Sequence, residues 1–177
     1  NLKDVSVSKN YSGEGIIINN GQAKGIIFKG VNKNENKIKN FLENNIVSGD
    51  IKKFKKNKIF IGSELAFNLN LNEGDKINLM SSAFVATPLG SLPKQESFNI
   101  AGIFNTGFVE FDQNIIFLTT DDALSLFDKE TKDQNLEIYL KDPLDANIYK
   151  KQIQNFNQNY FIYTWSDLNK SFFSALK

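Results

Sequence analysis

Residues 15–28 have the sequence GIIINNGQAKGIIF, in which two short apolar runs flank an Asn-Gly pair. Asn-Gly favours the tight turn of a β-hairpin, because both residues tolerate the positive φ angles that this turn requires. Upstream, Val5 and Val7 alternate with polar residues, as in a strand with one buried face. The sequence therefore predicts two antiparallel strands within residues 4–31.

The rest of the chain alternates between helical and extended patterns. Apolar residues three or four apart predict helices, and short apolar runs between turn residues predict strands. Helices are expected around 38–46, at 64–69 with Ser63 as N-cap, after the capping sequence Thr119–Asp122, after Asp145 and after Ser166. Strands are expected at 59–61, 76–80, 98–104, 114–118, 136–140 and 160–165. This mixed order predicts an α+β fold.

The composition argues against catalysis. Among 177 residues there is no His and no Cys, so the usual metal sites and the Ser-His and Cys-His nucleophile pairs cannot be built from this chain. We therefore predict a binding domain rather than an enzyme, with no cofactor and no metal. Lys and Arg number 21 against 20 acidic residues, which gives no general attraction to nucleic acid. The lysine-rich stretch 52–58 is interpreted as a solvated loop edge.

The ends of the chain suggest part of a longer protein. No apolar run approaches the roughly 18 residues that a membrane helix needs, and no signal peptide precedes the first strand. The chain begins with Asn1 rather than with Met. We expect a fragment cut from a larger protein.

The segment Ser81–Glu96 is long for a connection between two strands. A hairpin needs only two to five connecting residues, and longer irregular connections are often functional. The segment is apolar, yet Pro88, Gly90 and Pro93 disfavour a regular strand or helix. Two interpretations stay open: an irregular apolar protrusion that binds a partner, or a loop folded back to bury Phe84 and Leu89.

Several motifs occur in a fixed order along the chain. Thr87-Pro88-Leu89-Gly90-x-x-Pro93 is followed by Phe98-x-Ile100-x-Gly102-Ile103-Phe104. Gly62-x-Glu64-Leu65-Ala66 and Leu71-x-x-Gly74-Asp75 lie upstream; Gly107-x-x-Glu110-x-Asp112, Asp142-Pro143 and the set Trp165, Asn169, Phe172, Phe173, Ala175 and Leu176 lie downstream. In order and spacing, these motifs resemble the LolC/LolE permeases of the lipoprotein-releasing ABC transporter. The resemblance covers nearly the whole chain.

The resemblance implies a periplasmic domain with the fold of the MacB permease. In the LolC/LolE permeases, this domain lies between the first two transmembrane helices of an inner-membrane protein and faces the periplasm. Residues 1–30 and 134–177 would form a βαβ-type, porter-like lobe, and residues 31–133 an inserted, sabre-like lobe. The family domain starts earlier, so its first strand and helix would be absent or shortened here.

The resemblance also implies partners and contact residues. A protruding hairpin, the hook, would be residues 81–93 and would insert into a LolA-like periplasmic lipoprotein carrier, beside a supporting patch, the pad. Hook contacts would come from Phe84, Val85, Thr87, Pro88, Leu89, Gly90, Leu92 and Pro93, and pad contacts from Asn78, Gln95 and Glu96. Glu96 departs from the more basic family pattern. The intact hook favours a LolC-like subunit or a hybrid subunit that pairs with a second copy, rather than a LolE role alone.

Further partners follow from the same resemblance. They are a second permease subunit, which would be LolE-like or identical, the lipoprotein cargo, and a LolD-like ATPase bound through the membrane part. This chain has no phosphate-binding loop of its own, so ATP hydrolysis is expected in that separate subunit.

Two alternatives remain. The first keeps the fold and assigns it to a MacB/FtsX-type permease for efflux or cell-wall regulation. The second is an enzyme that uses Glu110 and Asp112, which would share one face if both lay on a strand. Asp121 and Asp122 could similarly form a catalytic pair, but their position favours capping of the following helix.

Overall fold

A computed structural model describes residues 5–32, 34–88, 90–156 and 159–168. Contacts divide the chain into two compact units: Ser8–Leu136, and Asn1–Val7 together with Glu137–Lys177. The larger unit contains most of the strands, which are β1 (Val5–Asn19), β2 (Gln22–Val31), β3 (Ile46–Gly49), β4 (Lys58–Gly62), β5 (Lys76–Thr87), β6 (Gly90–Phe104) and β7 (Ile115–Thr119). Its helices are α1 (Asn36–Asn45), α2 (Ser63–Asn68), α3 (Val109–Asp112) and α4 (Thr120–Leu126), with short 3₁₀ turns η1 (Ile51–Lys53) and η2 (Thr131–Asp133).

The predicted hairpin at the start of the chain is confirmed. β1 and β2 pair antiparallel from Tyr11 opposite Gly30 to Asn19 opposite Gln22. Asn20 and Gly21 form the turn with φ angles of 47° and 77°. Positive φ at both central residues is the requirement that Asn-Gly meets at low cost.

The pairings of the strands in the larger unit close into a ring. The order β2-β7-β4-β6-β5-β1 is completed by the pairing of β1 with β2, and β3 is added beside β6. β2 runs parallel to β7, and β4 runs parallel to β6, whereas the β1–β5 and β5–β6 pairs are antiparallel. β1 and β2 pair with each other, β1 also pairs with β5, and β2 also pairs with β7. The first hairpin therefore closes the ring.

Two apolar clusters fill the larger unit. The first cluster lies inside the ring, where Ile17, Leu79 and Phe98 are fully buried, and where α2 and α4 contribute Leu65 and Leu126. The second lies on the outer face of β4, β6 and β7 and is covered by α1 and the η1 turn. It consists largely of aromatic rings in edge and tilted contacts, namely Phe41, Phe54, Phe60, Phe104, Phe111 and Phe117. β4 and β7 are therefore apolar on both faces, as their unbroken hydrophobic runs indicate.

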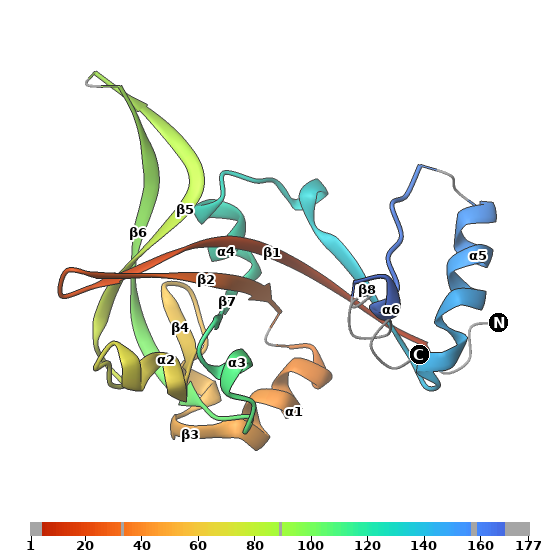
Figure 1. Cartoon of the computed structure of the whole chain (residues 1–177), viewed down its shortest axis with the longest axis horizontal. Coiled ribbons are helices and arrows are strands. Elements are labelled where there is room, and N and C mark those ends of the chain that lie inside the picture. Colours follow the sequence, from red (N-terminus) through yellow and green to blue (C-terminus); the bar gives the residue numbers. More distant parts are fainter. Residues whose placement is uncertain (1–4, 33, 89, 157–158, 169–177) are drawn as a thin grey trace. The chain divides into compact units, whose positions relative to one another are not determined.

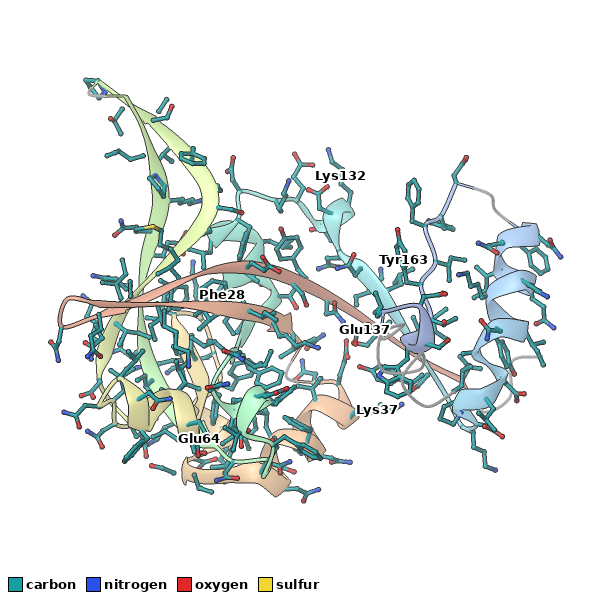
Figure 2. All side chains as sticks on the ribbon, viewed as in Figure 1. Phe28, Lys37, Glu64, Lys132, Glu137 and Tyr163 are labelled. Atoms are coloured by element: carbon teal, nitrogen blue, oxygen red, sulfur yellow. The ribbon has the colours of Figure 1, made fainter. Side chains whose placement is uncertain are left out.

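Phe28 shows how tightly the ring is packed. It lies on β2 (Figure 2) and is fully buried. Its ring contacts that of Phe127, with centroids 5.6 Å apart. On the facing strand, Gly15, which pairs with Ile26, leaves no room for a side chain, because a Cβ there would lie 2.4 Å from the ring of Phe28 and 2.3 Å from the carbonyl oxygen of Met80. Glycine is required at this position so that β1 and β5 can approach each other.

The smaller unit contains the start of β1 and β8 (Asn135–Leu140), which are neighbours in the sheet, followed by η3 (Pro143–Asp145), α5 (Ala146–Phe156) and α6 (Trp165–Leu168). An ion pair between Lys150 and Asp167, at 2.7 Å, joins α5 to α6. Lys150 and the backbone and hydroxyl of Thr164 hold the pKa of Asp167 well below its usual range. Of the described residues, no helix combines the length and the apolar character needed to cross a membrane.

Three local predictions were wrong. Residues 161–164 have no regular structure and Trp165 begins α6, so the strand at 160–165 is not formed. Thr164, rather than Ser166, caps this helix, because its hydroxyl accepts a hydrogen bond from the amide of Asp167 at 3.2 Å. Upstream, Gly62 takes the N-cap position predicted for Ser63, which is the first helical residue.

The other helix ends are mixed in outcome. Thr119 caps α4 as predicted and accepts from the amide of Asp122. Asp142, not Asp145, accepts from the amide of Leu144 in the turn that leads to α5. The apolar residues expected in the last helix, Phe172, Phe173 and Leu176, lie outside the described residues.

The lobe boundaries inferred from the resemblance stay a prediction. They differ from the compact units, because residues 8–30 belong to the larger unit. Those residues form most of β1 and β2, whose pairing with β5 and β7 closes the ring.

Candidate functional site

The candidate site is the hook, the part of the β5–β6 hairpin between residues 81 and 93. Figure 1 shows that this hairpin extends beyond the rest of the larger unit. The two strands remain paired almost to the tip, with Phe84 opposite Pro93, Val85 opposite Leu92 and Thr87 opposite Gly90. The expectation of an irregular protrusion is therefore corrected to a regular two-stranded ladder.

Pro93 does not break the ladder, for a geometric reason. Only alternate backbone N–H groups of a strand face its partner, and a two-stranded hairpin leaves the outer edge of each strand open. A proline is tolerated where its nitrogen faces such an edge. Near the tip, Gly90 takes a φ of 116°, and the hydroxyl of Thr87 donates to its carbonyl oxygen at 2.6 Å. Pro88 is exposed, and Leu89 lies outside the described residues.

The hook carries apolar side chains on both faces. Residues directly opposite each other share a face, so Phe84 and Pro93 lie on one face and Val85 and Leu92 on the other. Phe84 is 63% exposed, Val85 44% and Leu92 52%. Figure 2 shows the side chains of this part of the hairpin directed away from the strands on both sides. Of the two interpretations, the exposure of Phe84 favours a protrusion over a loop folded onto the core.

A bulge lies at the base of the hook, next to the ring. Met80 lies opposite Gln95 and Phe84 opposite Pro93, so Ser81, Ser82 and Ala83 together face only Lys94. Extra residues on one strand bend that strand and increase its twist. The bulge thus marks the place where the hairpin leaves the sheet.

The base of the hook is bonded to the end of α4. The hydroxyl of Ser81 donates to the carbonyl oxygen of Leu126 at 2.6 Å, and Ser81 is buried. The ammonium of Lys94 donates to the carbonyl oxygen of Ser125 at 2.5 Å. The hydroxyl of Ser125 in turn donates to Glu96 at 2.9 Å, and Glu96 lies 3.7 Å from Lys94.

The three predicted pad residues do not share one face. Asn78 lies opposite Ser97, and Gln95 lies opposite Met80, which places Asn78 and Gln95 on the exposed outer face of the ring. Glu96 lies opposite the fully buried Leu79 and so belongs to the inward-facing side, toward α4. A single patch can therefore contain Asn78 and Gln95, with Glu96 on the reverse side.

Two of the carboxylates considered for catalysis, Asp112 and Asp122, have structural partners. Glu110 and Asp112 lie in the helix α3 rather than on a strand, and Asp112 is buried and accepts bonds from the amide and hydroxyl of Thr106. Asp122 accepts from the hydroxyl of Thr119 at 2.8 Å and the amide of Asn57 at 2.9 Å, while its own amide donates to the hydroxyl of Thr119, the residue that caps α4. Burial raises the pKa of Asp122, and these hydrogen bonds oppose the rise. Within the described ranges, no three acidic side chains gather as metal ligands would.

Sequence reasoning missed the residues at the base of the hook. Ser81, Lys94 and Ser125 are ordinary polar residues in sequence, and their partners lie 29 to 45 positions away. The only local signal was the polar character of Ser81-Ser82 between two apolar stretches.

Comparisons with known proteins agree with the resemblance. No family model matches the chain. LolC of the lipoprotein-releasing system from Buchnera aphidicola subsp. Schizaphis graminum is 30% identical over 190 residues, which cover 99% of this chain and 44% of that protein. LolC from Neisseria meningitidis serogroup B is 22% identical and aligns with 100% of this chain, and LolC from Xylella fastidiosa is 25% identical over 67% of it.

The chain is similar in sequence to part of LolC. It spans between 29% and 44% of the length of these LolC relatives. The crystal structure of the periplasmic region of MacB from Actinobacillus actinomycetemcomitans aligns with 98% of this chain and 78% of its own, with a TM-score of 0.55 and 12% identity. The predicted MacB-like α+β fold is thereby confirmed.

Proposed function

We propose that this chain is the periplasmic domain of a lipoprotein-releasing ABC transporter permease in the inner membrane, and that its hook docks a LolA-like lipoprotein carrier. The observation that carries this proposal is the exposure of apolar side chains on both faces of the hook. A soluble domain gains no stability from such side chains in water, whereas a partner that surrounds the hook can bury both faces at once. Homology to LolC supports the assignment.

Binding would use the hook as a preformed apolar anchor. Full burial of a side chain such as that of Phe84 or Leu92 contributes about 1.5–3 kcal/mol. A paired ladder with Pro88 at its tip and Pro93 within one strand loses little conformational freedom on docking, so most of that gain remains as affinity. Asn78 and Gln95, on the outer face beside the hook, would supply polar contacts at the rim, where exposed pairs contribute specificity more than affinity.

The wider mechanism is mechanical coupling, in which this domain performs no chemical step. A separate LolD-like subunit would hydrolyse ATP and move the membrane helices of this subunit and its partner. The partner would be LolE-like or a second copy of the same protein. Motion of this domain would then pass an outer-membrane lipoprotein to the carrier held on the hook.

Calorimetric titration with the carrier of the same organism tests the proposal. Wild type should bind saturably, and Leu89→Asp should cost about 2 kcal/mol or more, because a charge would replace an apolar contact of the interface. Phe67→Ala is the matched control, since Phe67 is 83% exposed on α2, away from the hook. Equal affinity of wild type and Leu89→Asp would overturn the assigned contact.

The alternative is a MacB/FtsX-type permease for efflux or cell-wall regulation, which the shared fold also supports. The apolar hook distinguishes the two, because an adaptor surface has no evident need for it. Failure of wild type to bind the carrier would favour this alternative or a LolE-like role.

A further inference from the structure

The bulge at the base of the hook interrupts the ladder that would otherwise fix the direction of the hook. Three residues of β5 face one residue of β6 there, so regular cross-strand bonds are missing at the point where the hairpin leaves the ring. A two-stranded hairpin joined to a sheet through such a break is expected to pivot unless other contacts hold it.

Side chains of the bulge itself supply those contacts. Ser81 on β5 and Lys94 on β6 both lie at the bulge, and each donates to a carbonyl oxygen in the last turn of α4. The last carbonyls of a helix lack intrahelical partners, and a cation there also interacts favourably with the helix dipole. The carbonyl of Ser125 accepts from Asp128 as well as from Lys94.

Glu96 completes the arrangement. It accepts from the hydroxyl of Ser125 and lies beside the ammonium of Lys94, on the side of β6 opposite to Asn78 and Gln95. α4 is itself held firmly, because Leu126 is fully buried in the ring core and Asp122 bonds to the loop at Asn57. The end of α4 is thus a fixed point against which the hook can be oriented.

We infer that Ser81, Lys94, Glu96 and Ser125 form an anchor that orients the hook, and that Glu96 acts as a positioning residue rather than as a contact to the carrier. The part of the inference that concerns carrier binding rests on the proposed function. The orientation itself is a property of this chain alone. Loss of the anchor would widen the range of hook orientations, and a partner would have to select the productive one at a cost in affinity.

Distance measurement by double electron–electron resonance tests the anchor without any partner. The chain has no Cys, so spin labels at Ala86→Cys in the hook and Lys55→Cys in the lysine-rich loop would be the only ones attached. The unaltered anchor should give one narrow distance distribution, and Ser81→Ala with Lys94→Met should broaden it. Ser82→Ala with Lys76→Met is the matched control, because Ser82 and Lys76 are exposed. Equal widths in the anchor and control pairs would overturn the inference.

Glu96→Ala separates positioning from direct contact. An anchor residue should broaden the distance distribution and weaken carrier binding together, by about tenfold if one ordering step is added to docking. A direct contact should weaken binding and leave the distribution narrow, and that result would overturn the assignment of Glu96. Lys94→Arg, which retains the charge and the donors, should restore both readouts in comparison with Lys94→Met.

The two proposals fail in different ways. If wild type does not bind the carrier but Ser81→Ala with Lys94→Met broadens the distribution, the anchor stands and the carrier assignment is lost. If wild type binds and the distribution is unchanged in the anchor variants, the carrier assignment stands and the anchor is overturned. Circular dichroism of each variant checks that the ring remains folded.

Discussion

The two halves of the β5–β6 hairpin use the same kind of residue for opposite purposes. Below the bulge, Ile77, Leu79 and Phe98 are at most 2% exposed inside the ring. Above the bulge, Phe84 and Leu92 are more than half exposed. One pair of strands thus stabilises the domain at its base and offers a binding surface at its end. The contrast teaches that the apolar content of a strand says little about its role until its neighbours are known.

The largest expected effect on stability comes from a substitution in the lower half of the hairpin, below the bulge. Phe98→Ala should reduce the free energy of unfolding by about 3–5 kcal/mol, because it removes a fully buried ring and leaves a cavity. Urea denaturation followed by circular dichroism measures this loss. A change under about 1 kcal/mol would show that the lower half is not the stabilising one.

A charge introduced into the upper half of the hairpin should weaken carrier binding and leave the stability of the domain unchanged. Leu92→Asp should weaken carrier binding by about 2–4 kcal/mol, since the side chain is central to the proposed contact. Its free energy of unfolding should stay within about 0.5 kcal/mol of wild type, because Leu92 is 52% exposed. Calorimetry and urea denaturation on the same sample give both numbers. Destabilisation comparable to that of Phe98→Ala would erase the distinction between the halves.

Substitution of two glycines of the first hairpin, Gly15 and Gly25, tests how closely β1 approaches β5 at the bulge between the two halves. Gly15 lies opposite Ser81 at the bulge, and a Cβ there would meet the carbonyl oxygen of Met80. Gly15→Ala should therefore destabilise the fold by about 1–3 kcal/mol. Gly25→Ala is the control: its Cβ would have open space, so stability should be unchanged or raised by up to about 1 kcal/mol. Thermal unfolding compares the pair, and equal effects would contradict the close approach of β1 and β5.

The smallest effect concerns the helix that anchors the hook. Burial raises the pKa of Asp122 above its ordinary value of 3.8, so the folded state holds this proton more tightly than the unfolded state. The contribution of Asp122 to stability should then be fully present below pH 3.8 and decline as the pH rises through the folded-state pKa. The difference in unfolding free energy between wild type and Asp122→Asn, followed across acidic pH, measures it. A difference that grows in favour of wild type with rising pH would contradict the sign.

Local chemistry made part of the fold predictable. Asn20-Gly21 specifies its own turn, and Thr119 followed by acidic residues specifies a helix start, so both were predicted correctly. The strand at 160–165 was predicted from an apolar run, and that prediction was wrong. Thr164 and Asp167 hydrogen-bond to each other there and start the helix α6 instead. Ring closure depends on pairings such as Ile27 with Ile115, which no local pattern encodes.

The candidate site was predictable in position but not in form. Its apolar, proline-bounded composition marked residues 81–96 as unusual, and the resemblance assigned them a role. The regular ladder was missed because Pro93 argues against a strand unless one edge of that strand is known to be open. The face of Glu96 and the bonds to α4 depend on strand register, which sequence leaves undetermined where polar residues lie on both sides.

The most direct test of the central claim is photocrosslinking to the carrier. p-Benzoylphenylalanine would replace Phe84 in the hook or, as control, Phe67 on α2, since both side chains are exposed in wild type. We predict a specific crosslink to the carrier from position 84 and none from position 67. Crosslinks from position 67 alone, or equal yields from both positions, would contradict the claim that the hook is the docking element.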